Sequence, residues 1–193
     1  MARRKLLTKK NISLVLGLII FAVGYVQTQQ APEAVKQAAT ENQPGLYSVT
    51  RFVDGDTITV DMNGTKETIR MIGVDTPETH KPNSPVQCYG PAASAFTKNL
   101  IGNQKVRLEA DPKNQNRDRY DRLLRYVYLP DGRMVARELI AGGYGFAYTL
   151  YPFSNKADFV AAETEAKQAA KGLWGNCTVT TRSNGAQQTN DAP

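Results

Sequence analysis

The sequence contains almost none of the side chains that build zinc sites. Its 193 residues include a single histidine, His80, and two cysteines, Cys88 and Cys177, which are far apart and form no C-x-x-C pair. Because zinc sites use several such ligands at short spacings, the sequence excludes one. It also lacks the composition of fibrous or wholly disordered chains. With 41% hydrophobic and 22% charged residues, it fits one globular domain with tails.

A surplus of positive charge is absent outside the first residues. The formal net charge is +6, but residues 1–26 hold five bases and no acid, which leaves 19 bases against 18 acids in the rest of the chain. Net charge therefore does not identify a nucleic-acid partner. Residues 105–137 have a local surplus of nine bases over five acids. This segment either binds a polyanion or forms an ordinary solvated face.

Long apolar runs are also missing, except for one near the N-terminus. Residues 12–26 are uncharged and mainly apolar, and they follow the five bases, which is the pattern of an export signal. A membrane span needs about 17 to 25 residues, so this run is short for one. We predict that residues 1–26 are a cleaved signal peptide or a retained membrane anchor, and that the remaining chain is exported.

Composition divides the rest of the chain into three parts. Residues 27–45 are rich in Gln, Ala, Glu and Pro and are expected to form a flexible linker. Residues 46–177 have the apolar patterns and the size of a single folded domain. Residues 178–193 are polar and are expected to be disordered. Export allows a disulfide between Cys88 and Cys177, and two free buried cysteines are the alternative.

Hydrophobic patterns within the domain indicate short strands and a few helices. Alternating apolar residues predict strands, and longer runs bounded by Pro, Ser and Gly predict helices. The expected strands cover 47–52, 57–61, 70–74, 106–110 and 123–129, and the expected helices cover 91–100, 134–141 and 154–170, the last with Ser154 as its N-cap. This set favours a small barrel on which helices pack.

The Asn63-Gly64 pair predicts a hairpin. A three-residue loop with Gly64 in the left-handed position would place Asp56 directly opposite Arg70. A two-residue turn would put these two side chains on opposite faces of the sheet.

Three charged motifs stand out, and each alone has an ordinary structural explanation. Residues 54–57 (DGDT) are typical of a turn, residues 75–79 (DTPET) of a strand end before a proline turn, and residues 118–122 (DRYDR) of a solvated loop. Together with residues 89–98 (YGPAASAFTK), however, they resemble the staphylococcal nuclease family in order and spacing, over about residues 47–174.

This resemblance implies both a fold and an activity. The fold is α+β and mainly β, an OB-fold five-stranded barrel with about three packed helices. The activity is calcium-dependent hydrolysis of phosphodiester bonds in DNA and RNA that leaves 3'-phosphate ends. We expect a monomer without an obligate protein partner. The alternatives are a non-catalytic OB-fold module that only binds nucleic acid and, with less support, a calcium-binding structural domain.

The expected calcium site consists of two aspartates and one backbone carbonyl. Asp56 and Asp75, with the carbonyl of Thr76, supply the hard oxygen ligands that Ca²⁺ takes. So few protein ligands imply weak affinity, which suits the calcium-rich exterior of a cell. Asp54 and Thr57 are expected to orient water molecules on the ion.

Three further residues resemble the catalytic groups of the family. Glu78 corresponds to its general base. Arg70 and Arg122 correspond to its two phosphate-clamping arginines, whose planar forks can each engage two oxygens and stabilise transition-state charge. The presence of all three favours an enzyme over an inert binding module.

Substrate binding is expected from aromatic rings and one basic neighbour. Tyr120 and Tyr148 match nucleotide-contacting tyrosines, and Arg119 lies beside the first. Stacking on such rings accepts any base, although core packing is an alternative for Tyr148. Asp121 departs from the family pattern, which has glycine there. Its carboxylate either orients Arg122 or weakens phosphate binding.

Overall fold

The computed structural model describes residues 45–79 and 84–192. The predicted signal peptide or anchor at residues 1–26, residues 27–44 of the predicted linker, and His80 lie outside the described residues. Within the described ranges, no helix has the length and apolar character needed to cross a membrane.

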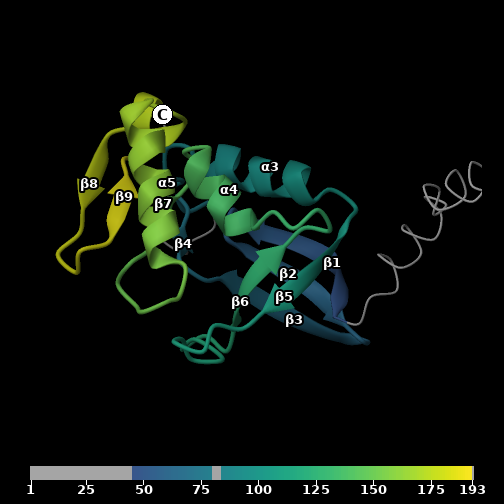
Figure 1. The fold of residues 1–193 in the computed structure, drawn as a ribbon. Helices are drawn as coiled ribbons and strands as arrows, with labels where there is room; N and C mark the ends of the chain where they lie inside the picture. The colour runs from purple at the N-terminus through teal and green to yellow at the C-terminus, as the bar shows by residue number, and fades with distance from the viewer. Residues whose placement is uncertain (1–44, 80–83, 193) are drawn as a thin grey trace, which may run out of the picture. The chain divides into compact units, whose positions relative to one another are not determined.

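Five strands close into a barrel in the order β1-β2-β3-β6-β5 (Figure 1). The pair β3–β6 is parallel, and the other neighbours are antiparallel. The strands are β1 (Leu46–Asp54), β2 (Thr57–Met62), β3 (Thr65–Met71), β5 (Lys105–Glu109) and β6 (Leu123–Tyr128). This barrel, with the helices on it, confirms the predicted α+β OB-fold class.

The turn between β2 and β3 decides which residues face each other. Asn63 and Gly64 both have positive φ, 56° and 91°, as a tight two-residue hairpin turn requires. Thr57, and not Asp56, is therefore paired with Arg70, and the three-residue loop is wrong. Asp56 precedes the first residue of β2, so its side chain does not follow the alternation of strand side chains between the two faces of the sheet. Its carboxylate still reaches Arg70.

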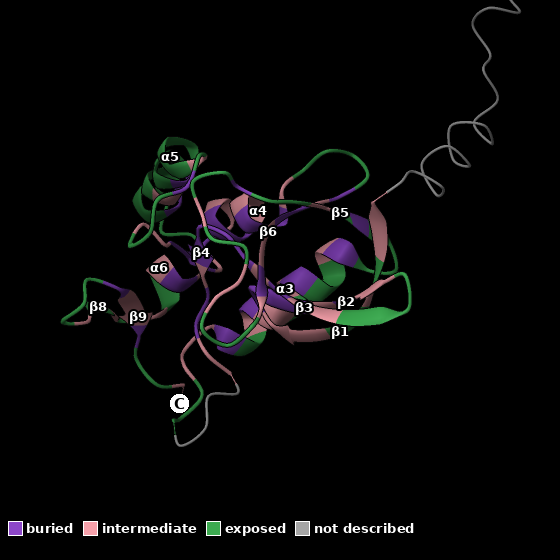
Figure 2. Cartoon of the chain, turned by 90° about the horizontal axis from the view of Figure 1, so that it is seen from below, coloured by how far each residue is buried: buried purple, intermediate pink, exposed green. Residues whose placement is uncertain are grey.

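Helices pack on the barrel and share its core. They are α3 (Gly90–Ile101), α4 (Val135–Ala141), α5 (Lys156–Gln168) and α6 (Leu173–Asn176). Ile58 and Ile69 from the barrel and Leu139 and Phe159 from the helices are fully buried in one cluster. Figure 2 shows this buried layer between the barrel strands and the helix faces turned toward them. Each such side chain contributes about 1.5 to 3 kcal/mol by leaving water.

One helix begins later than predicted, and one short helix was not predicted. Helix α5 begins at Lys156 because Ser154 does not cap it: the Ser154 hydroxyl and backbone N–H donate to the Asp111 carboxylate, at 3.0 and 2.6 Å. Helix α6 was not predicted, since four residues are too short to show a helical period.

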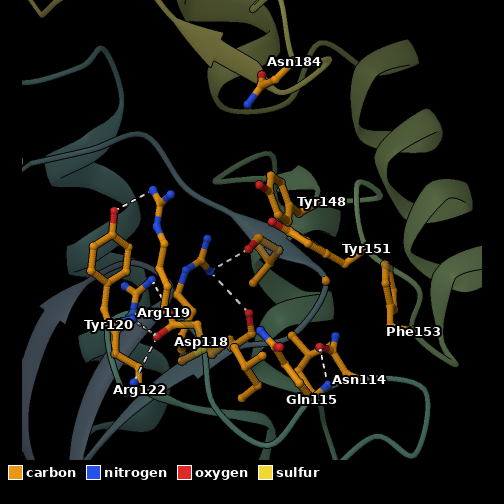
Figure 3. A pocket seen from close by; sticks show the side chains of 16 residues that line it. Asn114, Gln115, Asp118, Arg119, Tyr120, Arg122, Tyr148, Tyr151, Phe153 and Asn184 are labelled. Carbon is orange, nitrogen blue, oxygen red and sulfur yellow. Dashed lines mark hydrogen bonds and ion pairs between the residues drawn. The ribbon is translucent and has the colours of Figure 1, made fainter.

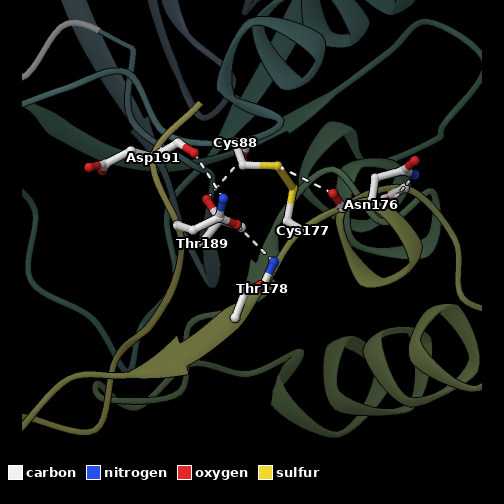
Figure 4. The surroundings of a disulfide bond; sticks show 8 residues. Cys88, Asn176, Cys177, Thr178, Thr189 and Asp191 are labelled. Carbon is white, nitrogen blue, oxygen red and sulfur yellow. Dashed lines mark hydrogen bonds between the residues drawn. A yellow bond between two sulfur atoms is a disulfide. The ribbon is translucent and has the colours of Figure 1, made fainter. Parts of the chain in front are cut away.

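The described part of the C-terminal segment, residues 178–192, contains a hairpin where we predicted a disordered tail at residues 178–193. Strands β8 (Val179–Thr181) and β9 (Gln187–Thr189) form an antiparallel hairpin. The predicted disulfide between Cys88 and Cys177 is present, with the Cα atoms 6.0 Å apart, and it joins the start of this segment to the domain (Figure 4). A polar segment with few apolar groups is thus held by covalent and backbone contacts, which composition does not show.

Candidate active site

Arg70 lies between two carboxylates that come from separate segments. Arg70 is in β3, Asp56 is in the turn before β2, and Asp75 is in β4 (Val74–Asp75), which pairs with β7 (Phe146–Ala147). The Arg70 Nη1 is 3.1 Å from Asp56 Oδ2, and its Nη2 is 2.6 Å from Asp75 Oδ1. The structure thus brings together three of the predicted site residues at one end of the barrel strands.

Neighbouring hydroxyl and amide groups hold the Asp56 carboxylate. Its Oδ2 accepts from the Thr76 backbone N–H at 2.8 Å and from the Thr76 hydroxyl at 3.0 Å, and its Oδ1 accepts from the Thr57 hydroxyl at 2.8 Å. Gly55 packs against Thr76 so closely that a Cβ there would lie 2.9 Å from the threonine side chain. This close approach explains the glycine of the DGDT motif.

The electrostatic surroundings of Asp75 resist its ionisation. Its pKa is raised to about 6 overall: burial is the largest cause, the charges of Asp56 and Glu78 also raise the pKa, and those of Arg70 and Arg182 lower it. Arg70 itself is nearly buried. Burial lowers its pKa, but the three carboxylates outweigh this effect and the net shift is upward. A crowded group of acids of this kind, in which Asp56 is buried and Asp75 and Glu78 are partly buried, is stabilised by added positive charge.

Glu78 is positioned through its backbone. The Glu78 N–H donates to the Gln87 side-chain oxygen at 2.8 Å, and the Gln87 N–H donates back to the Glu78 carbonyl at 2.9 Å. Next to it, the Thr79 hydroxyl donates to Asp54, so the predicted water-orienting aspartate contacts this same segment. Glu78 borders a polar pocket of about 290 Å³, which is lined by Glu78, Ser84, Pro85, Gln87, Arg182, Gln188 and Asp191.

Arg122 is held by a partner that the sequence analysis missed. Asp118 accepts hydrogen bonds from the Arg122 Nε at 2.7 Å and backbone N–H at 3.0 Å, and from the Tyr120 N–H at 2.9 Å. Burial raises the pKa of Asp118, but these hydrogen bonds lower it more. The spacing of four residues between an acid and an arginine was the available signal in the sequence.

Asp121 does not contact the arginine beside it. Its φ of 62° lies in the left-handed region that glycine favours, and its side chain, 87% exposed, lies 3.6 Å from Arg117. The orienting contact with Arg122 is therefore not formed: the backbone conformation that a glycine would supply is kept, and the carboxylate lies near Arg117 instead.

A second, larger pocket of about 340 Å³ gathers the other predicted residues (Figure 3). Arg70, Arg119, Tyr120, Arg122 and Tyr148 all line it, whereas Asp56, Asp75 and Glu78 do not. The sequence analysis did not assign the lining residues Asn114, Gln115, Tyr151 and Asn184.

The tyrosines in this pocket differ in exposure. Tyr120 is 63% exposed, and the guanidinium groups of Arg119 and Arg122 lie 4.8 and 5.3 Å from its ring centre. Tyr148 faces the pocket and is 6.0 Å from Tyr151, ring centre to ring centre, while Phe146 is buried. Residues 146–151 therefore contribute aromatic side chains to both the core and the pocket.

The barrel and its site define a class of protein. Arginines, carboxylates and aromatic rings gathered around the two pockets are groups suited to the binding and hydrolysis of a nucleic-acid phosphodiester. The domain is thus a hydrolase of the nuclease type.

Comparison with known proteins identifies the family. The family described as "Staphylococcal nuclease homologue" matches residues 68–176. The thermonuclease of Staphylococcus hyicus is 40% identical over 89% of this chain and 99% of its own length, and that of Staphylococcus intermedius is 41% identical over 82% and 95%. Endonuclease YncB of Bacillus subtilis is 46% identical over 70% of this chain and 65% of its own length. The chain belongs to the staphylococcal nuclease family, as its motifs predicted.

Proposed function

We propose that this protein is an exported, calcium-dependent nuclease that hydrolyses phosphodiester bonds in DNA and RNA and leaves 3'-phosphate ends. The observation that carries the proposal is the position of Arg70 between Asp56 and Asp75, at 3.1 and 2.6 Å. Arg70 is largely buried and shares two acids, and it would be available to a phosphate if a bound cation neutralised those acids.

The donor set fits calcium. Asp56, Asp75 and the Thr76 carbonyl would hold the ion through hard oxygen atoms, with Asp54 and Thr57 orienting its water ligands. When bound, the ion supplies positive charge to the phosphate oxygens and to the attacking water. Within the described residues, no group of three or more His, Cys, Asp or Glu side chains could hold a metal ion by itself, so the Thr76 carbonyl and water would have to complete the site.

The side chains of the protein would carry the remaining steps. Glu78 accepts the proton of the attacking water. Arg70 and Arg122 bind the non-bridging oxygens, and Asp118 fixes the plane of the second guanidinium by its hydrogen bonds. Their charge is aimed at oxygens that become more negative as the phosphorus becomes pentacoordinate.

The exposed pocket would bind the nucleotides. Tyr120 and Tyr148 offer ring faces for stacking, which tolerates any base and either sugar. Arg119 adds charge for the backbone. Two further observations support export: the apolar run at residues 12–26, and the Cys88–Cys177 disulfide, a bond that persists in oxidising compartments.

Hydrolysis of single-stranded DNA by the purified protein tests this function. We expect cleavage with calcium, none with excess chelator, and a loss of about 100-fold or more in kcat for Glu78→Gln, since general base catalysis contributes about 10² to 10⁴. Glu165→Gln, which removes an exposed acid of α5, is the matched control. Binding without cleavage in any condition would identify the inert OB-fold module instead.

A further inference from the structure

The β8–β9 hairpin borders both pockets of the site. Arg182, one residue after β8, lines the pocket that contains Glu78. Asn184, in the hairpin turn, lines the pocket that contains Arg70 and Tyr148, and Figure 3 shows it across that pocket from Asn114 and Gln115. One C-terminal segment therefore contributes to the walls of two neighbouring cavities.

The hairpin is firmly attached at this place. Besides the disulfide, Cys88 donates its N–H to the Asn190 carbonyl at 2.7 Å, and its carbonyl accepts from the Thr189 hydroxyl at 2.8 Å (Figure 4). On the other side, the Gln187 amide donates to Glu163 of α5 at 3.1 Å. Contacts to two elements of the domain fix the hairpin, so the residues of its turn have a defined position.

Arg182 is the cation among the described residues that line the Glu78 pocket. Its Nε donates to the Gln188 side-chain oxygen at 2.5 Å, and in the described part of the chain it forms no ion pair within 4.0 Å. Its charge acts on Asp75 and Tyr148, since it lowers the pKa of each. Arg182 therefore lies within electrostatic range of both pockets.

The charges around Arg182 make it important for the binding of an anionic substrate. Glu78 and Asp191 are carboxylates in the pocket that Arg182 lines, and Asp75 is close enough to interact with both Glu78 and Arg182. Among the described residues that line this pocket, a polyanion would meet two carboxylates and one cation. One guanidinium there offsets the repulsion and offers a bidentate contact to phosphate.

We propose that the hairpin forms one wall of the substrate groove and that Arg182 binds a backbone phosphate of the nucleic acid next to the one that is cleaved. The ligand is the phosphodiester backbone of a single strand. This inference rests on the proposed nuclease function, because it extends the path of the same substrate from the tyrosine-lined pocket past Glu78.

The salt dependence of binding tests the proposal without turnover. The affinity of the full-length protein, with calcium, for a fluorescein-labelled single-stranded phosphorothioate DNA is measured by anisotropy at several salt concentrations. Each phosphate contact to a single strand contributes about 0.7 to the slope of log affinity against log salt. We expect Arg182→Gln to weaken binding and to reduce this slope by about 0.7.

Two variants make the result specific. Arg51→Gln removes an exposed arginine of β1 that lines neither pocket and should leave the slope unchanged. Arg182→Lys should keep it, because a lysine still releases a counterion. An unchanged slope in Arg182→Gln, or an equal loss in Arg182→Lys, would overturn the proposal and leave Arg182 a structural role with Gln188. The labelled strand resists cleavage, so absence of hydrolysis in the wild type is a separate result that concerns the proposed function alone.

Discussion

The carboxylates of Asp118 and Asp111 each accept several hydrogen bonds and so fix the positions of neighbouring residues. Asp118 accepts from both the side chain and the backbone of Arg122, and Asp111 accepts from Tyr126, Ser154 and the Lys113 backbone. In both cases burial raises the pKa of the aspartate and hydrogen bonds lower it more. Each therefore keeps its charge at neutral pH and orders its neighbours.

Replacing Asp118 by Asn should reduce activity without unfolding the protein. The asparagine keeps an acceptor for the backbone but loses the ion pair to Arg122. We expect kcat to fall about tenfold, or about 1.5 kcal/mol, the scale of a hydrogen bond to a charged group, while KM changes less.

The matched control is Asp131→Asn, which breaks a similar pair with Arg133 on the surface away from both pockets. Steady-state kinetics and melting temperatures of the two variants check whether Asp118→Asn lowers kcat without unfolding the protein. An equal loss of activity in both, or a loss explained by melting, would contradict a positioning role.

Asp111 should make stability depend on pH. Because folding lowers its pKa, Asp111 stabilises the fold above its unfolded pKa of about 3.9, and this contribution is lost as pH falls through the folded value. At pH 7, Asp111→Asn should cost about 1 to 3 kcal/mol.

The difference between wild type and Asp111→Asn should shrink below about pH 4, as measured by urea unfolding at several pH values. Asp158→Asn, which alters an exposed pair with Arg137, should show little difference at any pH. If the difference in unfolding free energy between wild type and Asp111→Asn stayed constant down to low pH, the charge of Asp111 would not be what stabilises the fold.

Among the elements, those with a short repeat or a continuous motif were predictable. Strand alternation around Ile58 and Val60 and the motif residues 54–57, 75–79 and 118–122 all carry their signal within a few neighbouring positions. The bond between Ser154 and Asp111 joins residues 43 apart, so it could not be found locally, and it moved the start of α5. The β2–β3 register depended on turn geometry that the Asn63-Gly64 pair allows in more than one form.

The β8–β9 hairpin was missed for a different reason. Its residues are polar, and only Ala186 and Thr189 are buried. The hairpin is held by contacts to residues 86–88 that lie about half the chain away. Composition reports the apolar surface that a segment can bury, and it does not report a strand that docks through its backbone.

At the scale of the whole domain, the disulfide joins residues 89 positions apart. The enclosed stretch contains α3, β5, β6, α4, β7, α5 and α6. We expect the double variant Cys88→Ser/Cys177→Ser to lose about 2 to 4 kcal/mol of unfolding free energy, the typical contribution of a disulfide.

Urea unfolding of the wild type with and without reductant checks this value. Reductant should lower the stability of the wild type toward that of the variant and leave the variant unaffected. Equal stability of all three samples would show that noncovalent contacts alone hold the C-terminal segment.

The two arginines that we propose to bind phosphate differ in what holds them. Arg122 takes its direction from Asp118, four residues away in the same loop, so this loop carries its own alignment and could be grafted onto another barrel as one short segment. Arg70 takes its direction from Asp56 and Asp75, which belong to different segments. A transplanted β3 would carry Arg70 without the two carboxylates that orient it. Of the two arginines, only Arg122 could therefore be transferred together with the group that orients it.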